Sequence, residues 1–459
     1  MLRVLITPHR ELLPANSNSQ KLFVMLKLRP DSEVSDTLPP TAFAFVIDTS
    51  GSMYEVVSGD PRPTGKVSVQ DSRHYNEVTG GQSKLDLVIH ALQALLQSGR
   101  LRTEDKIALV QFDDQASILV GLTSGLQTHD LESAVTHLRD FSGGTRMGLG
   151  LQKTLDLLGG QDMAIRRALV FTDGETFDDD QCRELAHNFA DRNIPITALG
   201  VGDYQEDLLI HLSDMTGGHL FHVVPGQAIG TQISIEQLPT VLLEELGEAQ
   251  NEVIANLALS VKTVKGVKLE RILRAYPTQA EFSLDQQPYP IGNASGQDDT
   301  VFLLDFTVET RPASRMRIAQ IGMTYDVPGQ NRRGELPPEN LIVEFVSGQL
   351  TATTDQEVMG YLQQCNIAHL VNQATLTAKQ NPEQAEKLLQ QAETLARKTG
   401  NLAMTQSLQT AQDELRKTRK LSSESCKTVK LGSKGKTVKM NDGLNEGLSE
   451  SEIREQTGI

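Results

Sequence analysis

The stretch AFAFVIDTSGSM, residues 42–53, decides the predicted fold class, because an apolar run ends there in three oxygen-bearing side chains. The segment AFAFVID predicts a strand that is buried on both faces, as in the centre of a parallel sheet. Asp48, Ser50 and Ser52 follow at alternate positions, so they would face one way if the chain stayed extended. Buried oxygens are costly unless a partner satisfies them, and Mg²⁺ is a cation that prefers oxygen ligands.

Strand-like and helix-like segments alternate over residues 41–248. Apolar runs such as KIALVQF are followed by amphipathic runs, of which KLDLVIHALQALLQ is an example. This alternation predicts an open, doubly wound, mostly parallel α/β sheet, whose ligands bind outside the carboxyl ends of the strands. Two more segments fall at that edge. Thr145 follows a glycine pair and opens a helix, and Asp173 ends a strand before Gly174, which permits a sharp turn.

The regions on either side of this α/β domain, at residues 39–248, have different patterns. Residues 1–38 contain two strand-like runs, and residues 249–350 contain short alternating segments that predict an antiparallel β-sandwich. The N-terminal strands would complete that sandwich. Residues 355–418 predict a hairpin or bundle of two or three helices. Residues 419–459 predict a disordered tail, basic and then acidic, because large apolar side chains are scarce there.

The motif residues resemble the metal-ion-dependent adhesion site of the von Willebrand factor type A family, which has a Rossmann-like fold. That family carries the pattern DxSxS, then a Thr, then an Asp in a TDG-type turn. All five positions are present here in order, and they are Asp48, Ser50, Ser52, Thr145 and Asp173. The resemblance implies that these residues hold Mg²⁺ or Mn²⁺, directly or through water, and that the ion recruits an acidic side chain of a partner protein.

The resemblance predicts a metal-dependent protein-interaction module, a scaffold or regulator, and not an enzyme. Bacterial proteins that look like this one work with AAA+ ATPases or in kinase and phosphatase signalling systems. The implied partners are therefore an AAA+ ATPase, a Ser/Thr kinase or a phosphothreonine-binding protein. The alternative is a metal-dependent phosphoryl hydrolase of the haloacid-dehalogenase-like type. Such enzymes need a second Asp two positions after the first, and position 50 is Ser.

A long insertion at residues 54–82 separates the first motif from the next helix, whereas related chains start that helix within a few residues. Because the insertion leaves the strand end beside the expected ion, it would gate the site or select the partner. A tolerated surface insertion is the other interpretation. Asp60, Asp71 or Glu77 would fill the last coordination position in a self-blocked site.

The C-terminal region is basic in an otherwise acidic protein. The net charge of −16 disfavours nucleic acid and acidic membranes as partners, whereas residues 416–439 contain nine basic residues and a single acidic one. Thr418, Thr428 and Thr437 lie among these basic residues, which indicates phosphorylation sites as one interpretation. A solvated segment, or one that docks on the acidic body, is another. This basic segment also lacks aromatic side chains on which bases could stack, which is a second reason against nucleic acid as a partner.

The remaining sequence features concern the cellular compartment. Cys182, Cys365 and Cys426 lie far apart without CxxC spacing, so they predict free thiols and neither disulfides nor a zinc site. No apolar run reaches the roughly 18 residues of a membrane span, and the first apolar run is too short for a signal peptide. These features predict a cytoplasmic protein.

Overall fold

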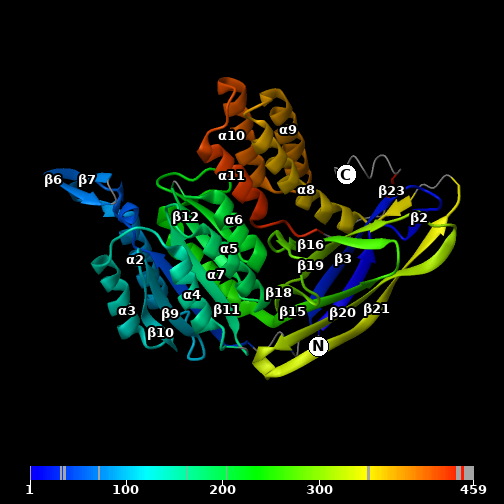
Figure 1. The fold of residues 1–459 in the computed structure, drawn as a ribbon, viewed down its shortest axis with the longest axis horizontal. Coiled ribbons are helices and arrows are strands. Elements are labelled where there is room, and N and C mark those ends of the chain that lie inside the picture. The colour runs from blue at the N-terminus through cyan, green and yellow to red at the C-terminus, as the bar shows by residue number, and fades with distance from the viewer. Residues whose placement is uncertain are drawn as a thin grey trace. The chain divides into compact units, whose positions relative to one another are not determined.

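The computed structural model describes residues 2–31, 34, 38–70, 73–161, 163–202, 204–348, 352–440 and 446–448. For residues 68–70, 73–77, 352 and 446–448 it describes the backbone alone. The chain divides into two compact units (Figure 1). One unit is Leu38–Glu252, and the other combines Met1–Thr37 with Val253–Ile459. In sequence, the first of these units is therefore inserted into the second.

A seven-stranded sheet forms the centre of the Leu38–Glu252 unit. Its strands are β4 (Thr41–Asp48), β9 (Lys106–Phe112), β10 (Ala116–Ser124), β11 (Ile165–Thr172), β12 (Ile196–Val201), β13 (Leu220–Val224) and β14 (Ile233–Ser234). The order is β10-β9-β4-β11-β12-β13-β14, and β10 runs antiparallel while the other neighbours pair in parallel. Every residue of β4, β11 and β12 is buried, as expected for strands covered on both faces.

Helices cover both faces of this sheet. They are α2 (Lys84–Gln97), α3 (Thr128–His137), α4 (Met147–Leu158), α5 (Asp179–Asp191), α6 (Glu206–Thr216) and α7 (Leu238–Asn251). Phe45 of β4 lines a small cavity with side chains of α2 and α3, whereas a Cβ at Gly150 of α4 would touch the next residue, Val46. Adjacent residues of a strand point to opposite faces, so the sheet is doubly wound as predicted.

The insertion after the first motif contains strands that the sequence did not predict. β5 (Val56–Ser58) pairs with β8 (Gln82–Ser83), and β6 (Arg62–Gln70) pairs with β7 (Arg73–Thr79). The pairing of β5 with β8 closes the base of the insertion, so α2 begins directly after β8. Figure 1 shows β6 and β7 as a hairpin that projects beyond α2.

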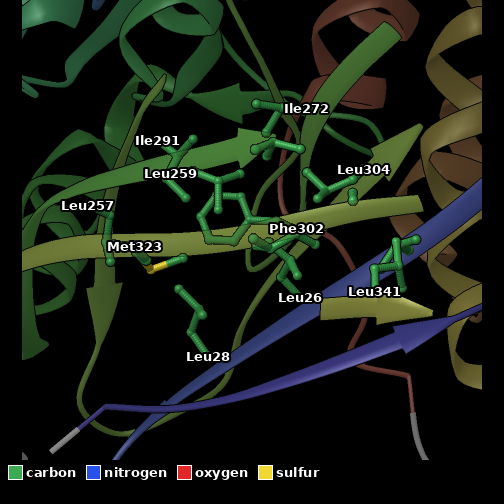
Figure 2. Close-up of a cluster of buried hydrophobic side chains, with 14 of the residues drawn as sticks. Leu26, Leu28, Leu257, Leu259, Ile272, Ile291, Phe302, Leu304, Met323 and Leu341 are labelled. Carbon is green, nitrogen blue, oxygen red and sulfur yellow. The ribbon is translucent and has the colours of Figure 1, made fainter. Parts of the chain in front are cut away.

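The other unit contains two five-stranded sheets. The strands of one, in spatial order, are β1 (Leu2–Pro8), β3 (Gln20–Pro30), β19 (Thr300–Val308), β16 (Val267–Tyr276) and β17 (Ala280–Phe282). Those of the second are β18 (Tyr289–Ser295), β15 (Glu252–Thr263), β20 (Ser314–Val327), β21 (Arg332–Val346) and β2 (Leu12–Pro14). Leu26 and Phe302 of the first sheet pack with Leu259 and Met323 of the second (Figure 2). The predicted β-sandwich is confirmed: β1, β3, β19, β16 and β17 pair antiparallel, as do β15, β20 and β21, whereas β2 pairs in parallel with β21.

Helices follow the sandwich in sequence. They are α8 (Gln356–Thr377), α9 (Pro382–Lys398), α10 (Leu402–Thr418) and α11 (Ser423–Lys434). The first half of α8 packs through Tyr361 and Leu362 on Phe23 of the sheet, and its second half packs in a separate cluster with the other helices. Among the helices that the structure describes, none is both long and apolar enough to span a lipid bilayer.

The prediction that residues 419–459 are disordered is wrong for the part of them that the structure describes. Val429 and Leu431 of α11 are buried. Beyond α11, the Thr437 N–H donates to the Pro277 carbonyl (2.9 Å), and a short strand, β23 (Glu446–Leu448), pairs with β22 (Ala352–Thr354). Few apolar side chains are needed here, because backbone hydrogen bonds to the sandwich hold the segment. Residues 441–445 and 449–459 of the predicted tail lie outside the described residues.

Candidate metal centre

The five predicted metal ligands lie at the carboxyl edge of the seven-stranded sheet. β4 ends at Asp48, and its parallel neighbour β11 ends one residue before Asp173. Thr145 lies in the loop before α4, which packs on the same strands. The loops that carry these residues are joined by the Gly51 N–H, which donates to the Gly143 carbonyl (3.1 Å).

Ser50 and Ser52 reach the site in different ways. Ser50 has an extended backbone, as the alternation of the motif predicts. Ser52 lies in a 3-10 helix, Gly51–Tyr54, so the chain does not stay extended through it. The turn nevertheless places the Ser52 Oγ 3.2 Å from the Ser50 Oγ, within hydrogen-bond distance. The helical turn, and not strand alternation, therefore brings the second serine to the site.

Hydrogen bonds connect the two carboxylates to their surroundings. The Ser50 N–H donates to one Asp48 oxygen (2.8 Å), and the Thr172 hydroxyl donates to the other (2.7 Å). The Ser52 hydroxyl donates to one oxygen of Asp173 (2.7 Å). These contacts orient both carboxyl groups before any ligand binds.

Glycines give the loops the space to approach one another. A Cβ at Gly143 or Gly144 would lie within 2.7 Å of a carboxylate oxygen of Asp114, so these glycines allow the two loops to approach closely. The chain bends at Gly174, as predicted, but Gly174 does not have the left-handed backbone that would require glycine. A side chain at Gly174 would instead lie 3.7 Å from the Ser52 Oγ and 3.9 Å from the Thr145 Oγ1. Glycine therefore keeps the space beside these two hydroxyls open.

The loop after Asp173 anchors Thr145. The Thr145 carbonyl accepts hydrogen bonds from the Phe177 N–H (2.9 Å) and the Thr176 hydroxyl (3.2 Å). The same hydroxyl accepts the Met147 N–H (3.0 Å) and so satisfies the first N–H of α4. Thr145 lies two residues before the helix and does not open it, which corrects the prediction.

The electrostatics of the centre are dominated by its two carboxylates. Asp48 is fully buried, and Asp173 is 3 % exposed. Burial, together with the nearby charge of Asp173, raises the pKa of Asp48 from 3.8 to about 7. Two carboxylates and three hydroxyls are hard oxygen donors, and no imidazole or thiolate belongs to the set. The residues thus fit a divalent cation such as Mg²⁺ or Mn²⁺.

Lys84 is a charged residue of the centre that was not predicted from the sequence. It is 6 % exposed, and its Nζ donates to Asp173 Oδ2 (2.7 Å) and pairs with Glu55 Oε2 (2.6 Å). One signal was available, because Lys84 is the first residue of α2. A cation is unfavourable at that end of a helix dipole, so its placement needs another reason.

Phe177 was also missed. Its side chain is 73 % exposed although it is large and apolar, and its ring would be 3.0 Å from a Cβ at Gly144. It therefore lies on the surface next to Thr145. Exposed aromatic side chains of this kind are frequent in protein–protein interfaces. The sequence alone gives no signal for it, because exposure depends on the packing of the loop.

The predicted self-blocking residues of the insertion are only partly visible. Asp60 is exposed, Asp71 lies outside the described residues, and the structure describes only the backbone of Glu77. Self-blocking by these residues stays a prediction. Among the described side chains of the insertion, the carboxylate of Glu55 approaches the centre through its ion pair with Lys84.

A second cluster of ionisable groups lies at the start of the neighbouring strands. His219, Glu245 and Glu248 are close enough to hold an ion. Arg167 pairs with Glu245 (2.9 Å), and the Thr197 hydroxyl donates to the same carboxylate (3.0 Å). Since Glu245 is already neutralised, we assign this cluster to a buried ion-pair network.

The three predicted phosphorylation sites lie in ordered structure. Thr428 is buried, and its hydroxyl donates to the Glu424 carbonyl (2.8 Å). The Thr437 hydroxyl donates to the Ala275 carbonyl (2.7 Å), and that of Thr418 donates within the last turn of α10. A kinase would need local unfolding to reach the first two. Phosphorylation therefore stays a prediction, without the disorder on which it was based. The three cysteines are free thiols, as predicted.

Comparisons with known proteins agree with this geometry. Residues 43–233 match the von Willebrand factor type A domain family, and residues 356–439 match the family of Sll0103-like, C-terminal alpha-helical domains. YfbK of Escherichia coli is 26 % identical over 224 residues, and a Borreliella burgdorferi protein is 25 % identical over 146 residues. These matches cover 46 % and 27 % of this chain, but only 33 % and 43 % of the relatives.

Two solved structures share the fold over nearly the whole chain. A von Willebrand factor type A protein from Catenulispora acidiphila matches 95 % of this chain and 97 % of its own, with a TM-score of 0.73 and 16 % identity. The ArnB paralog VWA2 from Sulfolobus acidocaldarius matches 94 % of this chain and 97 % of its own, with a TM-score of 0.60 and 15 % identity. At these identities the likeness concerns the fold alone.

Proposed function

We propose that this protein, in which residues 43–233 form a von Willebrand factor type A domain, is a metal-dependent protein-interaction module. Domains of this family are generally modules of that kind. In this chain the centre would hold Mg²⁺ or Mn²⁺ and capture an Asp or Glu side chain of a partner protein. The observation that carries the proposal is the network of two buried carboxylates and their hydroxyl neighbours at the carboxyl edge of the sheet.

Each residue type has a distinct role in this proposal. Asp48 and Asp173 supply negative charge to the ion, whereas Ser50, Ser52 and Thr145 supply neutral oxygens. When bound, the ion supplies Lewis acidity toward an incoming carboxylate. Because the hydroxyls add no charge, the centre holds the ion without excess negative charge that would repel an acidic partner. Thr172 and the Ser50 N–H keep Asp48 oriented.

The phosphoryl hydrolase alternative has no support in the site. Such an enzyme needs a carboxyl group two positions after the first Asp to protonate the leaving oxygen. That position is Ser50, whose hydroxyl lies beside Ser52. An aliphatic hydroxyl is too weak an acid to replace a carboxylic acid in this step.

Isothermal titration with Mn²⁺ tests the metal site. The Thr145→Ala variant should bind Mn²⁺ at least about tenfold more weakly, because a hydroxyl ligand is lost. Thr136→Ala is the matched control, since Thr136 lies on the exposed side of α3 and its hydroxyl bonds only to its own helix in the described contacts. Equal Mn²⁺ affinity of the two variants would contradict the assignment of Thr145.

Capture of partners tests the interaction. Immobilised protein should retain proteins from a lysate of its native cells in Mg²⁺, lose them in EDTA and lose them in Thr145→Ala. Mass spectrometry would then identify whether an AAA+ ATPase, a Ser/Thr kinase or a phosphothreonine-binding protein is among them. Retention of the same proteins in EDTA would contradict the proposal. The free cysteines support the cytoplasm as the compartment from which to prepare the lysate.

A further inference from the structure

Lys84 is a buried cation that contacts a predicted metal ligand directly. Its Nζ lies 2.7 Å from Asp173 Oδ2, while the other oxygen of Asp173 accepts the Ser52 hydroxyl (2.7 Å). The Asp173 carboxylate is therefore divided between a lysine on one side and a predicted metal ligand on the other. Lys84 thus acts on the centre through Asp173, so it is a candidate positioning residue.

The strands at the base of the insertion place Lys84 beside the first motif. β5 pairs with β8, and the Lys84 N–H donates to the Glu55 carbonyl (3.1 Å), which returns the chain to the end of the first motif. Gly202, with a φ of +74°, lies beside the ammonium group, since a Cβ there would be in van der Waals contact with Nζ (3.7 Å). Ser83 and Asp86 already cap α2. Capping therefore does not explain a lysine at this helix start, whose dipole disfavours it.

Charge balance shows what Lys84 changes. Asp48 and Asp173 alone would neutralise a divalent ion, which would leave no net charge to attract an anion. The ammonium group of Lys84 restores a net positive charge to the loaded centre. Glu55 offsets less of it than a buried carboxylate would, because its side chain is 66 % exposed and water screens its charge. Lys84 should consequently oppose cation binding and favour carboxylate binding.

We propose that Lys84 sets the ligand preference of the metal centre. It weakens the binding of the divalent ion and strengthens the binding of a carboxylate to the loaded centre. It also holds Asp173 Oδ2, so that only Oδ1 is turned toward Ser52. This inference rests on the proposed function, because it assumes that the centre binds a divalent ion.

The test uses the full chain with two probes, Mn²⁺ and acetate. Isothermal titration measures Mn²⁺ affinity, and water proton relaxation of the Mn²⁺-loaded protein measures acetate, which displaces bound water. Lys84→Gln removes the charge but retains a donor for Asp173, and Lys84→Met removes both. Either variant should bind Mn²⁺ about tenfold more tightly and acetate about tenfold more weakly, the order expected for removing a charge a few Å away.

Two controls separate charge from structure. Lys84→Arg keeps the charge and should stay near the wild type for both probes. Lys106→Met removes an exposed lysine at the opposite end of β9 and should change neither affinity. The circular dichroism spectrum identifies which variants are folded. If Lys84→Met does not fold, the more conservative variant Lys84→Gln carries the test.

The outcomes distinguish the two proposals. If a folded Lys84→Gln or Lys84→Met protein binds Mn²⁺ no more tightly than the wild type, or acetate no more weakly, the role of Lys84 is overturned. If the wild type itself binds no Mn²⁺, the proposed function fails first. A Lys84→Arg protein that behaves like Lys84→Gln would show that the lysine acts by shape and not by charge, and would also overturn the inference.

Discussion

Replacing Asp48 with Asn should make the metal-free protein more stable, although Asp48 is the first predicted metal ligand. Asp48 is fully buried, and burial raises its pKa to about 7. Asn has nearly the same shape and can still accept the Ser50 N–H that Asp48 accepts at 2.8 Å. The substitution removes a charge that the folded protein keeps without water around it. It therefore separates the loss of stability caused by the buried carboxylate from the role of that carboxylate in metal binding.

The sign follows from proton linkage. The folded protein holds the Asp48 proton up to about pH 7, whereas the unfolded chain loses it near 3.8. The folded state binds more protons across this window, so the free energy of unfolding falls as pH rises from about 4 to about 7. The Asp48→Asn variant does not lose stability in this way, because asparagine does not ionise. Its stability advantage should be about 4 kcal/mol at pH 8 and about 2 kcal/mol at pH 5, less about 1 kcal/mol for the altered bond to Thr172.

Urea denaturation in EDTA, followed by circular dichroism at pH 5 and pH 8, measures this difference. If the two units unfold in separate transitions, the stability difference is read from the transition that Mg²⁺ shifts in the wild type. Added Mg²⁺ should stabilise the wild type by about 2.7 kcal/mol at a hundred times its dissociation constant, and should stabilise Asp48→Asn far less. Asp156→Asn, at an exposed position of α4, is the matched control. A variant less stable than the wild type at pH 8 in EDTA, or an advantage that does not change with pH, would refute the reasoning.

Three further predictions concern the exposed surface beside the centre, the open space beside its hydroxyl groups and the C-terminal helix α11. Phe177→Ser should weaken capture of a protein partner by about 2 kcal/mol or more, as for an exposed aromatic hot spot, and leave Mn²⁺ affinity unchanged in titration calorimetry. A loss of Mn²⁺ binding would show that Phe177 supports the site itself. Gly174→Val should lower Mn²⁺ affinity by about tenfold or more, because its side chain would occupy the space beside two hydroxyls; unchanged affinity in a folded variant would contradict their role. Leu431→Ala in α11 should cost about 2–4 kcal/mol in urea denaturation, whereas Leu402→Ala, at a position 77 % exposed, should cost little; equal effects would mean that α11 does not pack as described.

Much of the architecture could be predicted from local patterns. The segment KLDLVIHALQALLQ coincides with α2, because apolar residues recur at helical spacing between a capping serine and the end of the pattern. Continuous apolar runs indicated β4 and β11, which are buried on both faces. The five motif residues could be found by type and order, and the structure brings them to one edge of the sheet. β10 and the strands of the insertion were missed, because edge strands and projecting hairpins bury too few side chains to leave a pattern.

The sequence by itself determined the doubly wound sheet, the sandwich and the identity of the five oxygen donors, since each depends on periodicity or on residues close together in the chain. Only the tertiary structure decided what surrounds the donors. Lys84 and Asp173 are 89 residues apart, and no local pattern pairs them. The ordered structure of α11 and of residues 435–440 likewise depends on partners far away in the sequence, such as the carbonyl of Pro277. The residues DTSGS at the end of a buried strand therefore predict a metal site, whereas the lysine beside Asp173 could be found only in the folded chain.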